Sequence, residues 1–125
     1  MLSLPPAVRI FVHREPTDLR RSFDSLAALV SAVLRQDPFS GHLFAFFNRK
    51  RDKLKLLVWE RGGFWLLYKR LEEGTFAPLD GEEIGARELF CLLEGLEVVR
   101  ARVRYDRPRR SEAVHHGRAV DFLAV

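Results

Sequence analysis

The residues of this sequence best suited to chemistry with another molecule are cations interleaved with large aromatic rings between Asn48 and Phe76. This stretch contains both tryptophans and all four lysines of the chain. Cationic side chains hold phosphates, and aromatic rings stack on bases. The stretch therefore predicts contact with nucleic acid through nine side chains: Arg49, Lys50, Arg51, Lys53, Lys55, Trp59, Tyr68, Lys69 and Arg70.

Two of the three basic clusters lie at predicted turns or helix ends. Three consecutive cations occupy the turn Asn48–Asp52, which is either a mobile basic finger that tracks DNA or an ordinary polar hairpin tip. Arg20 and Arg21 lie in the predicted first turn of a helix, where the helix dipole disfavours cations. Free amides at that position bind phosphate, so these arginines form either an anion site or a solvated surface turn that a pair with Asp24 supports.

The third basic cluster is a row of arginines near the C-terminus. Between residues 98 and 105, arginines alternate with apolar residues, which predicts an edge strand or an extended arm. The row either contacts phosphates or protects a strand edge against aggregation. Its members are Arg100, Arg102 and Arg104, and the charge continues with Arg107, Arg109 and Arg110.

Catalytic, metal and cofactor chemistry find little support. The carboxylates stand in no recognisable metal or acid–base motif, and no phosphate loop or nucleophile motif occurs. Cys91 lies in an apolar run, so we expect a buried thiol without a disulfide. The pair His115–His116 has no third ligand nearby. We therefore predict a protein that is not an enzyme and has no cofactor, no bound metal and no small-molecule ligand.

Apolar spacing and turn residues predict the elements that position the basic clusters. A short strand spans residues 8–12, and steps of three and four predict a long amphipathic helix over residues 19–34, capped by Thr17 or Asp18. Three antiparallel strands follow at 43–47, 53–59 and 64–70, and a shorter helix follows at 86–94. The core face of the long helix is predicted from its spacing: Leu19, Phe23, Leu26, Val30, Val33 and Leu34.

The second hairpin, with a four-residue loop at 60–63, predicts a register in which Trp59 faces Phe64 and Leu57 faces Leu66. The two tryptophans then point to opposite faces of the sheet. We expect Trp65 to be buried and Trp59 to be partly exposed. Both faces are apolar, so either helix 86–94 covers the second face or an aromatic face remains for a partner.

Length and composition limit the architecture. The chain has 125 residues, 47% of them hydrophobic, a net charge of +4 and a pI near 9.7. These values predict one α+β domain over residues 1–105, with a small antiparallel sheet, followed by a basic, flexible tail over 106–125. No apolar run approaches the roughly 20 residues that span a bilayer, and we expect a cytoplasmic protein.

Four segments carry a family resemblance: 15–30, 39–44, 48–59 and 65–76. They resemble the small accessory protein, often called TnpB, of the IS66 class of bacterial insertion sequences, which is unrelated to the RNA-guided nuclease of the same name. The resemblance runs from about residue 4 to residue 105. It implies a non-catalytic helper of transposition that acts beside a separate transposase, which is its expected protein partner.

Residues and resemblance together predict an accessory protein of transposition that binds DNA through its basic clusters. The alternative is a protein adaptor that joins the transposase complex through an aromatic sheet face and never touches DNA. Ionic strength separates the two, because phosphate contacts weaken steeply with salt and apolar contacts do not.

Overall fold

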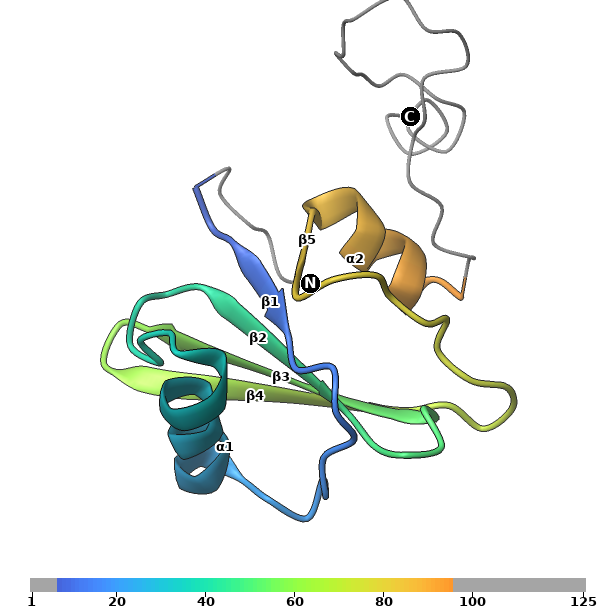
Figure 1. The fold of residues 1–125 in the computed structure, drawn as a ribbon, viewed down its shortest axis with the longest axis horizontal. Coiled ribbons are helices and arrows are strands. Elements are labelled where there is room, and N and C mark those ends of the chain that lie inside the picture. Colours follow the sequence, from blue (N-terminus) through green and yellow to red (C-terminus); the bar gives the residue numbers. More distant parts are fainter. Residues whose placement is uncertain (1–6, 96–125) are drawn as a thin grey trace, which may run out of the picture.

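The computed structural model describes residues 7–95, which form a five-stranded sheet in the order β4-β3-β2-β1-β5 (Figure 1). Strands β1 and β2 pair in parallel, and every other neighbouring pair is antiparallel. The predicted α+β class and the three antiparallel strands at 43–47, 53–59 and 64–70 are confirmed, but the sheet as a whole is mixed because β1 and β2 are parallel. The strand bounds are β1 Ile10–Val12, β2 Leu43–Phe47, β3 Lys53–Glu60, β4 Gly63–Arg70 and β5 Glu83–Ile84.

The long helix begins later than its apolar spacing predicts. It consists of α1 (Phe23–Leu29) and a π-helical turn, η1 (Val30–Leu34), with Ser22 as N-cap. The cap predicted at Thr17 or Asp18 is therefore wrong. Residues 13–22 instead cross the sheet as a loop, tied by the hydrogen bond from the Thr17 N–H to the Phe47 carbonyl at 2.8 Å.

Only part of the predicted helix face is core. Leu19, Leu26 and Val30 are buried, as predicted, whereas Phe23 is 43% exposed and Val33 is 51% exposed. The prediction fails at Phe23 because it stands at the first turn, away from the sheet. It fails at Val33 because this residue lies in the π-helical turn, where hydrogen bonds join residues five apart. Apolar residues spaced by three and four therefore do not stay on one face through this turn.

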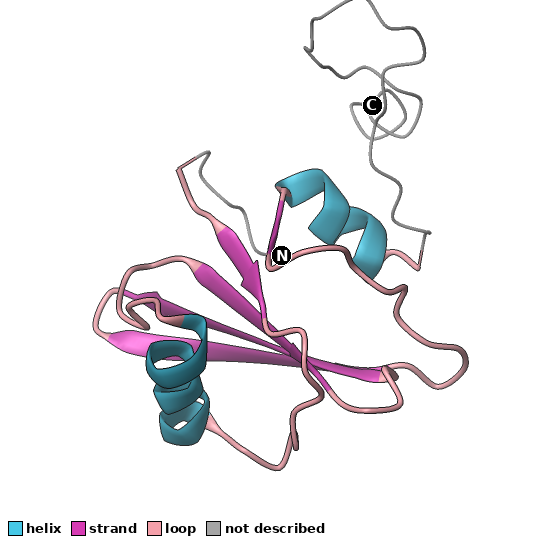
Figure 2. Cartoon of the chain, in the orientation of Figure 1, coloured by secondary structure: helices cyan, strands magenta, loops and turns pink. Residues whose placement is uncertain are grey.

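One helix packs against each face of the sheet, so the reading of two covered faces is confirmed for the middle of the sheet but not for the edge strand β4 (Figure 2). The α1 side packs around Leu57, Phe44 and Phe46 of the sheet. On the other face, α2 (Ala86–Leu93) buries Leu89 and Leu92 against the sheet. Cys91 is buried there as expected, and burial raises the pKa of its thiol.

The predicted hairpin register is confirmed, with Trp59 opposite Phe64 and Leu57 opposite Leu66. Glu60 and Gly63 also pair, so the loop is the two-residue turn Arg61-Gly62, with φ of 51° and 85°. Both residues are left-handed, as a type I′ hairpin turn requires.

The prediction for the two tryptophans is half right. Trp59 is half-buried, as expected, but Trp65 is 56% exposed. Trp65 lies on the edge strand β4, beyond the cluster that α2 covers, and its Nε1 donates a hydrogen bond to the Glu60 carboxylate at 3.0 Å. Sharing a face with buried residues does not bury a side chain at the edge of that face.

Several predictions lie outside the described residues: the arginine row at 100–104, the tail at 106–125 and the pair His115–His116. Within residues 7–95, no helix has the length and apolar character needed to cross a membrane.

Candidate nucleic-acid interface

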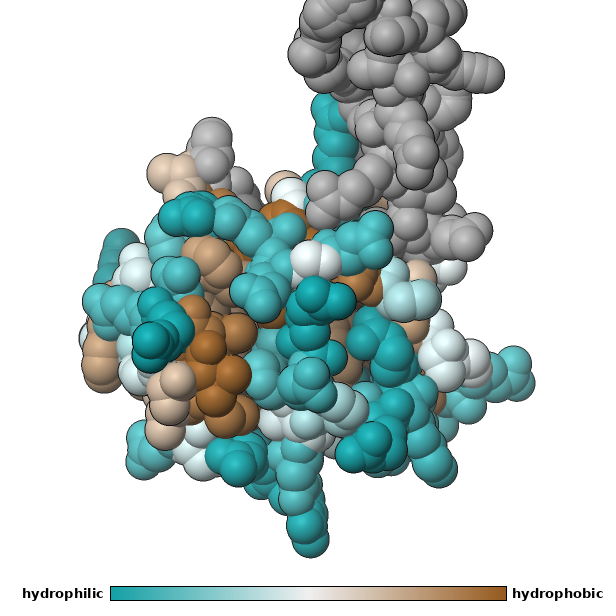
Figure 3. Space-filling view, viewed as in Figure 1, coloured by the Kyte–Doolittle hydropathy of each residue, from teal (hydrophilic) through white to brown (hydrophobic). Residues whose placement is uncertain are grey.

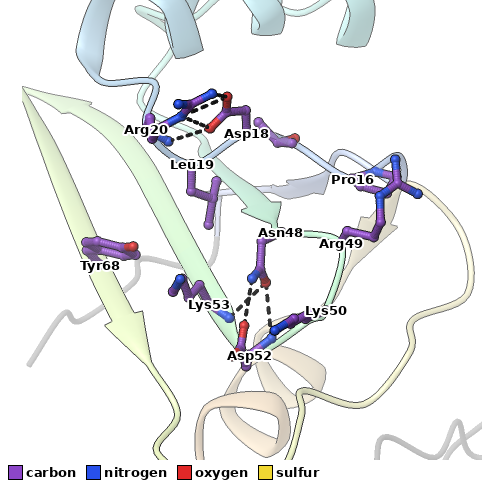
Figure 4. Close-up of a pocket in the computed structure, with 11 residues that line it drawn as sticks. Pro16, Asp18, Leu19, Arg20, Asn48, Arg49, Lys50, Asp52, Lys53 and Tyr68 are labelled. Carbon is purple, nitrogen blue, oxygen red and sulfur yellow. Dashed lines mark hydrogen bonds and ion pairs between the residues drawn. The ribbon is translucent and has the colours of Figure 1, made fainter.

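A pocket of about 640 Å³ lies where three segments distant in sequence meet (Figure 4). The segment 16–20 forms one wall, the β2–β3 turn at 48–53 forms the other, and Tyr68 of β4 lines it from the edge of the sheet. The pocket brings together five of the predicted contact residues: Arg20, Arg49, Lys50, Lys53 and Tyr68.

The pocket exists because α1 covers only part of its sheet face. The helix begins at Phe23, so the end of the sheet near Lys53 is covered by the loop 13–22 alone. Leu19 of this loop is buried, and its side chain points toward the middle of the pocket in Figure 4. The loop does not reach over β4, which leaves Tyr68 56% exposed.

Arg20 and Asp18 form a bidentate ion pair on the first wall. The guanidinium donates to the carboxylate with distances from 2.6 to 3.1 Å, and the Arg20 N–H donates to Asp18 Oδ1 at 3.0 Å. These bonds hold the pKa of Asp18 well below its usual range. The predicted pair of Arg20 with Asp24 does not form, because both arginines precede the helix. Arg20 remains 90% exposed and presents its outer N–H groups to solvent.

The second wall is an ordered turn, so the mobile finger of the sequence prediction is wrong. Asn48 organises it: its Oδ1 accepts from the backbone N–H groups of Asp52 and Lys53, and its Nδ2 donates to the Asp52 carboxylate at 2.6 Å. That last bond lowers the pKa of Asp52. The prediction missed the role of Asn48, although an Asn at the start of a polar turn is a known turn signal.

Arg51 points into the fold rather than outward. Its φ is 60°, and its guanidinium lies 4.2 Å from the ring centroid of Phe47. The same group donates to the carbonyls of Phe76 and Ala77 at 3.2 and 2.8 Å. Burial lowers the pKa of this guanidinium. These contacts make Arg51 a clamp between the turn and the loop after β4, which removes it from the set of phosphate contacts.

Lys55 is also removed from that set, because it is only 7% exposed. Its Nζ donates to the Arg21 carbonyl at 2.7 Å and lies 4.8 Å from the ring centroid of Tyr68. The ammonium therefore fastens the loop before α1 to the sheet. Arg21 contributes its carbonyl to this contact and keeps an exposed side chain.

The remaining cations of the turn have no counter-charge within bonding distance. Arg49 and Lys50 are exposed, Lys53 is half-buried, and none of the three forms an ion pair with another described residue. Both carboxylates of the pocket already accept hydrogen bonds, Asp18 from Arg20 and Asp52 from Asn48. The pocket therefore offers free positive charge at its rim.

The other predicted contact residues that the structure describes do not line the pocket. Trp59 is six residues along β3 from Lys53, or about 20 Å, and packs edge-on against Phe39 and Phe64. Lys69 points to the opposite face, where its Nζ donates to the Leu93 carbonyl at 3.0 Å. Arg70 is the cross-strand neighbour of Lys53, and its guanidinium pairs with Glu72 at 3.0 Å.

Residues 8–103 match the model of a protein family described as IS66 Orf2 like protein. The chain belongs to the IS66 Orf2-like family. Members of this family are accessory proteins of insertion sequences, which confirms the resemblance seen in the sequence. This family match gives no evidence of catalysis. Among the described residues, no three His, Cys, Asp or Glu side chains group closely enough to hold a metal ion.

Two curated relatives of this IS66 Orf2-like protein come from Sinorhizobium fredii (strain NBRC 101917 / NGR234), and both are named as uncharacterized proteins. The protein y4jC is 34% identical over 106 residues, covering 82% of this chain and 91% of the relative. The protein y4hO is 36% identical over 102 residues, covering 78% of this chain and 88% of the relative. No solved structure matches the chain.

Proposed function

We propose that this accessory protein binds DNA during transposition, and that the basic pocket is its contact site. The observation that carries the proposal is the convergence of Arg20, Arg49, Lys50 and Lys53 around one exposed aromatic ring, from segments up to about fifty residues apart. Separate basic clusters in a sequence are common, whereas their convergence on one concave surface is typical of a site for a polyanion.

Electrostatics favours a phosphate backbone as the ligand. The exposed cations stay close together at the cost of mutual repulsion, which a phosphate relieves. Neutralising DNA phosphates also releases condensed counterions, so the affinity gained is large at low salt and falls steeply as salt rises. Because the two pocket carboxylates are already hydrogen-bonded, they oppose an incoming phosphate less than free carboxylates would.

The adaptor function is the second candidate, and an exposed apolar surface favours it. Figure 3 shows hydrophobic surface beside α1 with hydrophilic residues around it. Phe39 is 56% exposed and packs edge-on against Trp59, with ring centroids 5.0 Å apart. The Phe39–Trp59 contact lies toward the Arg61 hairpin, at the end of β3 opposite the pocket. The two functions therefore use different ends of the molecule and are separable by mutation.

The DNA proposal predicts that Arg49→Ala with Lys50→Ala weakens DNA binding without unfolding the protein. Fluorescence anisotropy with a labelled oligonucleotide, over a series of salt concentrations, measures the effect. Each lost phosphate contact lowers the slope of log affinity against log salt by about one, so we expect a slope reduced by about two. Urea unfolding should stay close to wild type, because exposed charges contribute little to stability.

The matched control removes two charges from residues that do not line the pocket, one after η1 and one in the β3–β4 turn. Arg35 and Arg61 are exposed and left-handed, with φ of 57° and 51°. Asn tolerates that conformation, so Arg35→Asn with Arg61→Asn keeps the backbone while removing the same charge. We expect this control to bind DNA nearly as the wild type does. Equal losses in both double variants would show that net charge, and not the pocket, governs binding.

A further inference from the structure

The basic site is concave, and its shape limits which form of DNA can enter it. A pocket of about 640 Å³ falls in the range of sites that enclose small molecules, about 300–1,000 Å³. The Asp18–Arg20 pair stands on one side of it and the 48–53 turn on the other (Figure 4). A base in a duplex is stacked inside the helix and cannot enter such a pocket, whereas an unpaired base can.

Tyr68 offers the stacking surface that an unpaired base needs. The Lys55 ammonium lies over its ring, 4.8 Å from the centroid, and is itself held by the Arg21 carbonyl. This contact covers one side of the ring from within the fold. The side chain is nevertheless 56% exposed, so the pocket side of the ring is open.

Among the cations that line the pocket, Lys53 adjoins Tyr68 on the sheet, and it stands where a phosphate of the same nucleotide would lie. Lys55 faces Tyr68 across the two strands, so Lys53, two residues earlier on β3, is its diagonal neighbour on the same face. Diagonal neighbours lie about 7–8 Å apart. Lys53 therefore reaches the phosphate of a base stacked on Tyr68, and Lys50 and Arg49 continue the positive rim from there.

From these observations we infer that the pocket is a site for an unpaired nucleotide of single-stranded DNA, with its base on Tyr68 and its phosphate at Lys53. The inference rests on the proposed function, which it makes specific to single strands or to the ends and gaps of duplexes. Stacking supplies the preference for an unpaired base, and the cations supply affinity that any DNA shares.

The test compares a blunt duplex with the same duplex carrying a single-stranded overhang, by fluorescence anisotropy on the full chain. We expect the wild type to bind the overhang DNA more tightly, and Tyr68→Ala to lose about 5- to 150-fold of that affinity, as one stacked base contributes. The affinity for the blunt duplex should stay unchanged. Tyr68→Phe keeps the ring and should keep the preference.

Trp65→Ala is the matched control, because Trp65 is equally exposed on the same strand but points to the opposite face. It should bind both DNAs as the wild type does. If Tyr68→Ala lowers the melting temperature, Tyr68→Leu keeps a large apolar side chain opposite Lys55, lacks the ring and should show the same loss. Equal wild-type affinity for the two DNAs, or a preference that survives both ring-deleting variants, overturns the inference. Wild-type protein that binds neither DNA overturns the proposed function itself.

Discussion

At the residue scale, neighbouring cations of one type have different roles. Lys53 and Lys55 lie two residues apart on the same face of β3, yet Lys53 is half-buried at the pocket and Lys55 is 7% exposed. The difference comes from the loop before α1, which passes over Lys55 and offers it the Arg21 carbonyl. A long aliphatic stem with a hydrogen-bonded ammonium is a packing group as well as a charge.

We expect Lys55→Ala to lower the free energy of unfolding by about 2–4 kcal/mol, because it removes buried methylenes at about 0.8 kcal/mol each and a charged hydrogen bond. Lys53→Ala, the control on the same face, should cost less than about 1 kcal/mol, because its side chain has no hydrogen-bond partner among the described residues. Urea unfolding measures both values. Equal costs for the two variants would show that the contact with Arg21 contributes nothing to stability.

At the element scale, the basic turn between β2 and β3 is hydrogen-bonded to the loop after β4 and still exposes Arg49 and Lys50. Its backbone receives two long-range hydrogen bonds, from Leu71 N–H to the Asp52 carbonyl and from Phe76 N–H to the Arg51 carbonyl, both at 2.7 Å. The Arg51 side chain adds two more contacts to the same loop. The turn therefore presents Arg49 and Lys50 from a fixed backbone, which lowers the entropy lost when a phosphate binds.

Arg51→Lys should destabilise the protein by about 1–3 kcal/mol, because a single ammonium cannot reproduce the forked contact with two carbonyls. The variant keeps the positive charge at residue 51 and the left-handed backbone. It therefore tests only the pair of hydrogen bonds that the guanidinium donates to the two carbonyls. Hydrogen exchange at the Phe76 amide should accelerate with it, since that amide bonds to Arg51. Arg49→Lys is the control and should leave both the free energy of unfolding and the exchange rate of the Phe76 amide at wild-type values. An unchanged exchange rate in Arg51→Lys would show that the Arg51 side chain does not hold the turn to the loop after β4.

At the scale of the whole molecule, three carboxylates have lowered pKa values, and one of them joins segments that are distant in sequence. Glu83 of β5 receives a bidentate bond from Arg9, next to β1, at 2.8 Å, and this lowers the pKa of Glu83. Asp18 and Asp52 have lowered pKa values at the two walls of the pocket. Each of these carboxylates is more acidic in the folded chain than in the unfolded chain, where carboxyl pKa values are about 4.

The sign of the acid response follows from these shifts. A carboxylate whose folded pKa is lowered stabilises the fold above its unfolded pKa, and this contribution is lost as pH falls through the folded value. We expect the urea midpoint to be flat near neutral pH and to fall below about pH 4. Glu83→Gln should be less stable at pH 7 and should show a shallower fall. Parallel curves for Glu83→Gln and wild type would show that the pair with Arg9 is not linked to folding.

The sequence was sufficient to predict the elements that depend on near neighbours. Apolar runs and turn residues predicted the three antiparallel strands, the register of Trp59 with Phe64 and the short helix α2, because these features arise from contacts between residues close along the chain. The basic character of the turn was also readable from the sequence. The four segments that resemble the IS66 family also indicated an accessory role.

Only the tertiary structure decided which of these side chains remain available to a ligand. Arg51 and Lys55 turn inward because carbonyls of Phe76, Ala77 and Arg21, far away in sequence, lie within reach of them. Phe23 is exposed because it stands in the first turn of α1, and Trp65 is exposed because it lies on the edge strand beyond the cluster that α2 covers. Burial depends on what packs from elsewhere in the chain, and local periodicity carries no information about that. The pocket itself, formed by segments 16–20 and 48–53 and by Tyr68, is for the same reason a property of the fold alone.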